Sequence, residues 1–333
     1  MTTLTSPHDI LAAVPFLVGF KPTDSIVLIS LKDDAINLAM RIDFPSKISS
    51  LELANVSRHL LRNNSQAALV VFYLPHKFSP DHPVVQEISQ LLATLPLDLK
   101  ESLVVQNGRW RSLLCSDYTC CPIEGNHLPE IENSRIAAEQ VALGKPLPFD
   151  SLQELNESIS ATESDPELIA MIKTIPTLDY EKNPVAKQRE GAEAVIDFIA
   201  DFAADGVCRD KKLTALVLVR LQDLQVRDFA LGSVAADTLD IYFNAWRWLL
   251  RQAPVGYIAP VANLFAAVAY ERGDGALAHR SLDRAVADEP GYPMTSLLRR
   301  VFNSGWAPSS FAAMRAELHP RICDALFSGS INS

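Results

Sequence analysis

Residues 25–31 read SIVLISL, a continuous run of apolar and β-branched side chains that decides the fold of the first part of the chain. Such a run predicts a strand that is buried on both faces. A second run of this kind follows at 67–74 (AALVVFYL), and the segments at 36–44 and 99–106 also have strand character. Helical patterns precede the first run and separate the others. The order predicts an α/β domain with a mixed sheet and flanking helices.

Local signals mark the first helix and one tight hairpin. Residues 6–9 (SPHD) predict a helix start, because serine can cap a helix and proline suits its first turn. Asn107-Gly108 is the strongest two-residue hairpin signal in the chain, and it predicts a returning strand over 109–114. We interpret Asp24 as a turn residue before the first strand, and His76 as a solvated side chain in a proline-rich loop.

Beyond the first 123 residues the pattern changes. Residues 124–182 carry 12 acidic and four basic side chains, whereas the whole chain has 40 acidic and 30 basic residues and a net charge of −10. Most of the charge imbalance is therefore local, and we interpret 124–184 as an acidic connector with short helices. After it the apolar spacing is helical throughout. The sequence thus predicts an α/β domain over 1–123, this connector, and an all-α domain over 185–330.

One helical hairpin in the last domain is similar to a tetratricopeptide repeat. Residues 260–292 read as two helices joined by a Gly273-Asp274 turn, and the second helix has the spacing of such a repeat at Ala278, Leu282 and Ala285. A repeat array needs about three units to bury a continuous core. Two interpretations stay open: a groove for a peptide or protein partner, or a plain helical bundle with one well-formed hairpin.

The densest group of chemically active side chains lies at 114–127, which read LCSDYTCCPIEGNH. Zinc in closed sites takes four Cys or His ligands, and this segment supplies Cys115, Cys120, Cys121 and His127. The pair of C-x-x-C motifs typical of structural zinc sites is absent from the sequence. A zinc site with these four ligands is the first hypothesis for the segment.

Two other hypotheses explain the same cysteines. A redox site would use the vicinal pair Cys120-Cys121 together with Cys115, and Arg109 and Arg111 on the preceding strand are cations that can lower a thiol pKa. Alternatively, the small and weakly polar cysteine side chains fill a tight turn, as free cysteines often do in cores. Packing is the simplest interpretation of the three.

Composition disfavours several classes of protein. Nucleic-acid binding relies on clusters of Lys and Arg, and no dense basic run occurs. No segment reaches the roughly 18 consecutive apolar residues of a membrane span, and the beginning of the chain lacks the basic start of a signal peptide. Five scattered cysteines fit reduced thiols, so we expect a cytoplasmic protein. Without a glycine-rich phosphate loop or a nucleophile motif, we expect no cofactor beyond the zinc of the first hypothesis.

Two stretches resemble a known family. They are residues 10–31 (ILAAVPFLVGFKPTDSIVLISL) and residues 108–125 (GRWRSLLCSDYTCCPIEG). On both, the chain resembles an actinobacterial family described as domain of unknown function 4192, and its helical half is similar as well. The resemblance implies no activity, cofactor or partner. It implies that Arg109, Trp110 and Asp117, together with the cysteines, are signature positions of the family.

From the sequence we expect a non-catalytic interaction or scaffold protein whose helical domain binds a protein partner. The alternative is a metal-binding or thiol-redox module, or an enzyme, centred on the segment from Cys115 to His127. The two hypotheses place the function in different halves of the chain. The arrangement of the cysteines and of the helical hairpin therefore bears on both.

Overall fold

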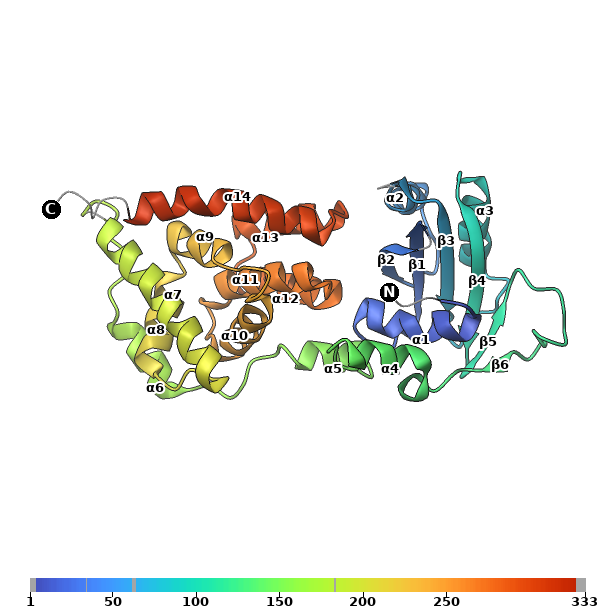
Figure 1. The fold of residues 1–333 in the computed structure, drawn as a ribbon, viewed down its shortest axis with the longest axis horizontal. Helices are drawn as coiled ribbons and strands as arrows, with labels where there is room; N and C mark the ends of the chain where they lie inside the picture. Colours follow the sequence, from blue (N-terminus) through green and yellow to red (C-terminus); the bar gives the residue numbers. More distant parts are fainter. Residues whose placement is uncertain (1–3, 34, 62–63, 183, 328–333) are drawn as a thin grey trace. The chain divides into compact units, whose positions relative to one another are not determined.

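The computed structural model describes residues 4–33, 35–61, 64–182 and 184–327 (Figure 1). The chain divides into two compact units, Met1–Leu155 and Asn156–Ser333. The first unit combines a mixed sheet with helices and the second is helical, so the predicted fold class is confirmed. Each unit has hydrophobic clusters of its own.

The α/β unit is built on one six-stranded mixed sheet. In chain order its strands are β1 (Ser25–Lys32), β2 (Ala35–Asp43), β3 (Ala67–Tyr73), β4 (Asp98–Gln106), β5 (Arg109–Ser112) and β6 (Asn126–His127). Their order across the sheet is β2-β1-β3-β4-β5-β6. Every neighbouring pair is antiparallel except β3 and β4, which are parallel. β1 is buried over most of its length and β3 over all of it, as their apolar runs predict.

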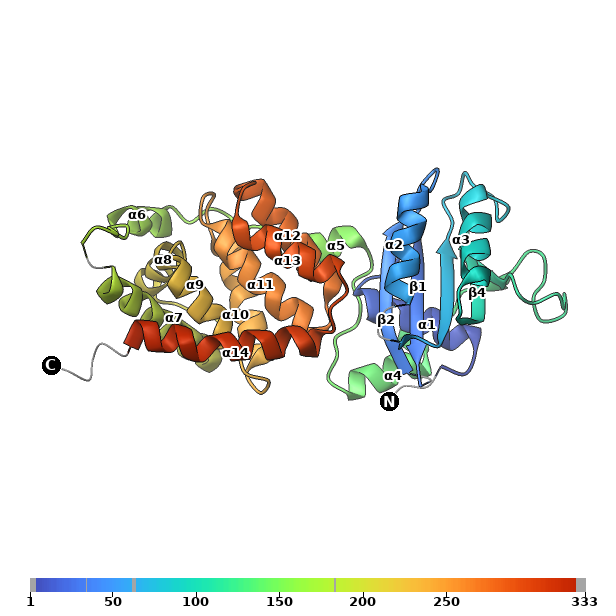
Figure 2. The same cartoon turned by 90° about the horizontal axis from the view of Figure 1, so that it is seen from above.

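Helices cover both faces of this sheet. α2 (Ser50–Leu60) and α3 (Pro83–Thr94) pack against one face, where Ile26 and Phe72 belong to the main hydrophobic core. α1 (Pro7–Val18) lies on the other face (Figure 2). The sheet is therefore enclosed between helices at its centre, which explains why its central strands are apolar on both sides.

Local signals place the ends of these elements. The Ser6 side chain caps α1 by accepting a hydrogen bond from the Asp9 amide at 3.2 Å. Asn107 and Gly108 form the turn between β4 and β5, and both have positive φ values, as a two-residue hairpin requires. The predicted hairpin is confirmed, and its returning strand ends at Ser112, earlier than expected.

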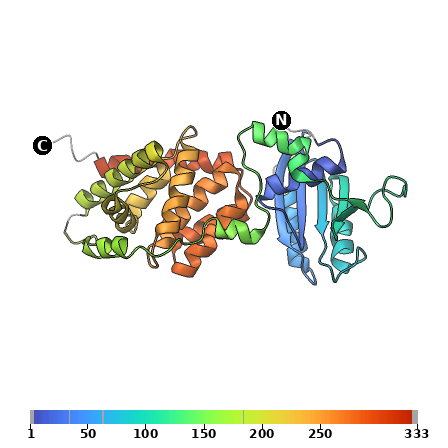
Figure 3. The ribbon, with the colours of Figure 1, turned by 90° about the horizontal axis from the view of Figure 1, so that it is seen from below.

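The segment predicted as a connector over 124–184 is divided between the two units. It holds the 3-10 helix η2 (Ile131–Asn133) and the helices α4 (Arg135–Ala142), α5 (Leu152–Glu157) and α6 (Pro166–Thr174). α4 packs against α1 (Figure 3). Ile136 of α4 is buried in a cluster with Ala12 and Ala13 of α1. α6 packs against the helical unit through Leu168 and Ile172, both buried. The predicted boundaries therefore differ from the division after Leu155, because apolar side chains anchor each part of the segment to its own unit.

The helical unit contains the predicted hairpin. After α6, the helices of this unit are α7 (Val185–Asp205), α8 (Lys211–Arg220), α9 (Leu224–Gly232), α10 (Leu239–Gln252), α11 (Ile258–Arg272), α12 (Gly275–Asp288), α13 (Pro293–Asn303) and α14 (Pro308–Phe327). α11 and α12 form this helical hairpin, and Gly273 turns the chain between them with φ at 91°. Ala266 and Ala278 are fully buried, which allows the two helices to approach closely. Within the described ranges, no helix of either unit is long and apolar enough to cross a membrane.

α11 is the central helix of this unit. It packs against α9, α10, α12, α13 and α14, and most of its side chains are buried. Arg315 of α14 makes a bidentate ion pair with Glu271 of α11, at 2.6 and 3.0 Å, with both side chains buried. Repeat arrays bind partners along extended concave surfaces of exposed helices. The enclosure of α11 does not offer such a surface along this helix.

A glycine in α7 tests how closely α7 packs against α8 and α9. A Cβ atom added to Gly191 would lie 2.8 Å from Cβ of Arg220 and 2.9 Å from Cγ2 of Val226. Gly191→Ala should therefore lower the free energy of unfolding by about 1–3 kcal/mol through overpacking, although alanine is the better helix former. Gly275→Ala is the matched control, because nothing lies within 4 Å of its added Cβ. Urea unfolding, monitored by circular dichroism, measures the stability of both variants. A Gly191→Ala protein as stable as the wild type would contradict the close packing of α7 against α8 and α9.

Candidate functional site

The three cysteines of the predicted zinc segment come together in one surface loop. We call residues 113–125, which connect β5 to β6, the thiol loop. The Cys115 and Cys120 sulfurs lie 3.1 Å apart, the Cys120 and Cys121 sulfurs lie 3.8 Å apart, and all three sulfurs are within 4.8 Å of one another. Cys120 is exposed and the other two are partly exposed. The packing interpretation does not fit, because these thiols lie at the surface and not in a core.

Hydrogen bonds among the thiols separate their pKa values. The Cys115 and Cys120 thiols share a hydrogen bond, which holds the pKa of Cys115 below its ordinary value. The same contact raises the pKa of Cys120 to about 12, because Cys120 shares its proton. The Asp117 carbonyl oxygen also lies 3.8 Å from the Cys115 sulfur and 3.5 Å from the Cys120 sulfur. The thiol loop therefore favours one thiolate that is hydrogen-bonded by its neighbour.

Arg109, Trp110 and Asp117, the residues expected as signature positions, hold the thiol loop in shape. Arg109 Nη1 donates a hydrogen bond to the Gly125 carbonyl oxygen at 2.7 Å. The Trp110 indole donates to the His127 carbonyl oxygen at 3.1 Å. Within the loop, the Asp117 carboxylate accepts hydrogen bonds from the hydroxyl and the amide of Thr119, which lower the pKa of Asp117. These contacts fix both ends of the loop and the turn between the cysteines.

The fourth predicted ligand, His127, takes a different position. It belongs to β6, and its Nε2 atom lies 3.3 Å from Nη2 of Arg109. In the described part of the chain, the group of potential ligands within 4.8 Å of one another consists of the three cysteines without this histidine. The structure thus brings together three of the four predicted ligands and places the fourth beside Arg109.

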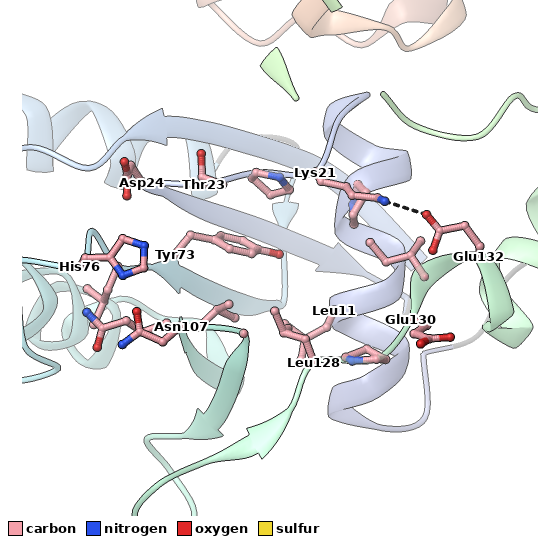
Figure 4. A pocket seen from close by; sticks show the side chains of 18 residues that line it. Leu11, Lys21, Thr23, Asp24, Tyr73, His76, Asn107, Leu128, Glu130 and Glu132 are labelled. Carbon is pink, nitrogen blue, oxygen red and sulfur yellow. Dashed lines mark hydrogen bonds and ion pairs between the residues drawn. The ribbon is translucent and has the colours of Figure 1, made fainter. Parts of the chain in front are cut away.

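A cavity of about 440 Å³ lies elsewhere in the α/β unit, at the edge of the sheet where β3 and β4 end and β1 begins. Four segments and α1 surround it (Figure 4). They are residues 21–24, the ends of β3 and β4 with the residues that follow them, residues 128–132, and Leu11 and Pro15 of α1. The carboxyl ends of parallel strands are a common place for ligands, and small-molecule sites typically have about 300–1,000 Å³.

Tyr73 points into this cavity from the end of β3 (Figure 4). The residue is 8% exposed, and burial raises the pKa of its hydroxyl. Within the described residues, this hydroxyl has no hydrogen-bond partner. The hydroxyl oxygen faces the open space of the cavity, where solvent or a ligand can reach it. Tyr73 can therefore form a hydrogen bond with a ligand bound there.

Lys21 closes one side of the cavity together with two carboxylates. Its Nζ atom lies 2.6 Å from a carboxylate oxygen of Asp150 and 2.6 Å from one of Glu132. Hydrogen bonds with Asp150 and Glu132 raise the pKa of Lys21, and the same contact lowers the pKa of Glu132. The lining also carries Asp24 and Glu130. Carboxylates therefore outnumber ammonium groups around the cavity.

Sequence patterns identified the cysteines but missed the cavity. Tyr73 reads as one more residue of a buried run, and Lys21 meets Glu132 across 111 positions of the chain. Asp24 and His76, interpreted as a turn residue and a solvated side chain, both line the cavity. One signal was available: the strand segments at 67–74 and 99–106 each run into a polar loop, and parallel pairing of these two strands places both loops at one edge.

A family model described as Domain of unknown function (DUF4192) matches residues 7–309. That range contains the whole sheet, the thiol loop and most of the helical unit. No curated protein and no solved structure matches the chain. The cavity and the thiol loop both lie within the region that the family model matches.

The ion pairs of Lys21 should stabilise the α/β unit over a defined pH range. Glu132 has a lowered pKa, so its contribution is present above its ordinary pKa of 4.5 and is lost as pH falls through the folded value. Lys21 has a raised pKa, so its contribution is lost only above its ordinary value of 10.5. Lys21→Met should therefore cost about 1 kcal/mol or less near neutral pH and almost nothing near pH 3.

Urea unfolding of the wild type and of Lys21→Met at both pH values measures this difference. Lys47→Met is the matched control, because Lys47 is an exposed lysine of the same unit. It should leave the unfolding midpoint unchanged at either pH. An equal loss for Lys21→Met at both pH values would show that the ion pairs do not stabilise this side of the cavity.

Proposed function

The chain belongs to the family described as domain of unknown function DUF4192. For this member of the family, we propose that the α/β unit binds a small organic molecule in the cavity beside Tyr73. The ligand is neutral or cationic and carries a hydroxyl or amine group. The actinobacterial source of the chain and its cytoplasmic location stay predictions.

The observation that carries this proposal is the Tyr73 hydroxyl. It is held on a buried strand, it points into a cavity of suitable volume, and no described group of the protein forms a hydrogen bond with it. Ligand sites typically combine apolar walls with a few polar groups that fix orientation. Leu11, Pro15 and Leu128 supply apolar walls here, and Tyr73 supplies a polar group directed at the ligand.

The charge of the lining favours a neutral or cationic ligand over an anion. Asp24, Glu130 and Glu132 contribute three carboxylates, and Lys21 is the one lysine or arginine that lines the cavity within the described residues. Two carboxylates already neutralise Lys21, so its charge is not available to a phosphate or carboxylate ligand. An anion would lose hydration on entry and meet a field of its own sign.

Binding, without a reaction, is the function that this lining supports best. An activated nucleophile needs a base within hydrogen-bond reach, about 2.6–3.2 Å. Among the described lining residues, the hydroxyls of Tyr73 and Thr23 form no hydrogen bond with a histidine or a carboxylate. His76 is an exposed residue of the lining. We therefore propose a binding site and assign no catalytic residue.

The interaction role expected for the helical unit stays a prediction. The tetratricopeptide-like hairpin of α11 and α12 supports it. The enclosure of α11 by neighbouring helices argues against a groove along that helix, so a protein partner would have to bind another surface. The cavity, which has both a volume and an unpartnered polar group, is the better supported site.

Tyr73→Phe should separate ligand binding from stability. Without ligand, the variant should be about as stable as the wild type, because the Tyr73 hydroxyl faces the cavity and forms no described hydrogen bond with the protein. For an amine or polyol that binds the wild type, the dissociation constant should rise about 2- to 10-fold, the effect of one lost hydrogen bond. Ligand-observed NMR with matched sets of amines, polyols, carboxylates and phosphates, followed by titration, measures this.

Two further variants control the experiment. Tyr118→Phe changes an exposed tyrosine of the same unit and should leave binding unchanged. Leu128→Trp fills the cavity from a half-buried position and should abolish binding. The proposal fails if no compound of the four sets binds, if only carboxylates and phosphates bind, or if Tyr73→Phe binds the same compounds as tightly as the wild type.

A further inference from the structure

The thiol loop is separate from the proposed binding cavity. No residue of the thiol loop is among the described residues that line the cavity. The loop nevertheless concentrates three thiols within 4.8 Å at the surface of the α/β unit. Its chemistry is therefore independent of the ligand proposed for Tyr73.

The three sulfurs lie close enough together to be ligands of a single metal ion. Zinc–sulfur bonds are about 2.3 Å long, so two thiolates on a tetrahedral ion lie about 3.8 Å apart. The Cys120 and Cys121 sulfurs are 3.8 Å apart, and the Cys115 and Cys120 sulfurs are 3.1 Å apart. One ion can therefore bond all three sulfurs after small side-chain rotations.

A disulfide is the main competing explanation, and it accounts for only two of the sulfurs. A disulfide bond is about 2.05 Å long, so Cys115 and Cys120 would have to approach by about 1 Å. Cys121 would then be left without a partner, although it lies in the same group. The Cys120 sulfur lies close to both other sulfurs. A single ion bound by all three sulfurs requires this closeness, whereas a disulfide does not.

The protein holds this arrangement through contacts that do not use the sulfurs. The amide of Cys121 donates to the Asp117 carbonyl oxygen at 2.9 Å, which closes the turn that contains Cys120. The Asn126 side chain donates to the Cys120 carbonyl oxygen at 2.8 Å. The amide of Cys115 donates to the Ser112 hydroxyl at 3.2 Å. Each cysteine backbone is thus tied to the turn or to a strand end, and the thiols are positioned before any ion binds.

We infer that Cys115, Cys120 and Cys121 together bind one thiophilic metal ion, Zn²⁺, as three thiolates. On binding, the three thiols release their protons to solvent and three metal–sulfur bonds form, with no change in oxidation state. Soft thiolate ligands favour zinc over magnesium and calcium, which prefer oxygen ligands.

The fourth position of the ion is open to solvent or to a ligand from outside the thiol loop. His127, the histidine that follows the cysteines, lies beside Arg109 and not with the sulfurs. Zinc sites with three protein ligands and an open position bind water or substrate there, whereas structural sites are closed by a fourth protein ligand. The loop therefore holds an accessible zinc ion, not a closed structural one.

Cobalt titration of the reduced full-length chain, purified without a histidine tag and kept under nitrogen, tests this inference. Co²⁺ is the probe, because its thiolate complexes absorb strongly by charge transfer and tetrahedral Co²⁺ absorbs in the visible range. One equivalent should saturate both absorptions, and added Zn²⁺ should remove them. Elemental analysis of untreated protein should find about one zinc ion per chain.

Single variants identify the ligands. Cys115→Ser, Cys120→Ser and Cys121→Ser should each weaken Co²⁺ binding by more than about 100-fold, beyond the usual effect of an outer-shell change. Cys323→Ser is the matched control, because this cysteine lies in the helical unit and should leave binding unchanged. His127→Gln should also leave it unchanged. Circular dichroism confirms that each variant is folded.

Three results would overturn the inference. The first is the absence of the charge-transfer band from the reduced wild-type protein. The second is a band that persists in Cys120→Ser, because that cysteine lies between the other two. The third is a Cys115–Cys120 disulfide, found by mass spectrometry in metal-free protein isolated under nitrogen. Loss of the band in His127→Gln would instead overturn the open fourth position and make His127 the fourth ligand.

Discussion

The pairing of β3 with its two neighbours is the constraint on which the α/β unit depends. β3 is buried along its whole length, antiparallel to β1 and parallel to β4. These directions bring the start of β1 and the ends of β3 and β4 to one edge of the sheet. The register places Ser25, Tyr73 and Val105 side by side across the three strands. The cavity follows from this order, because each strand changes into a loop at the same edge and supplies one wall.

The same row of paired residues extends toward the thiol loop. Val105 of β4 pairs with Trp110 of β5, and Trp110 pairs with Asn126 of β6. The short strands β5 and β6 thereby hold the two ends of the thiol loop at adjacent positions, and Arg109 and Trp110 bond across the gap. Arg109 and Trp110 thus act as supports for the loop. The cysteines themselves are presented to solvent by the loop that these residues hold.

The features that could be predicted from the sequence are those that depend on residues close together in the chain. The buried runs of β1 and β3, the serine cap of α1 and the turn between β4 and β5 depend on local patterns, and so does the closeness of the three thiols. The meeting of Lys21 with Glu132, and the anchoring of Ile136 against α1, join residues more than 100 positions apart. Such contacts depend on strand order and on which face a helix covers, and local periodicity specifies neither.

Backbone conformation explains how one carboxylate comes to lie at the cavity. The described residues other than glycine with positive φ are Asp24, Asp33, Asn64 and Asn107. Asn107 needs this conformation for its hairpin turn, and Asp33 lies in the turn between β1 and β2. Asp24 precedes β1 with φ at 42°, in the left-handed region that aspartate visits more readily than most residues other than glycine. Its side chain is exposed and lines the cavity. The turn that leads the chain into β1 therefore also adds a negative charge to this edge of the sheet.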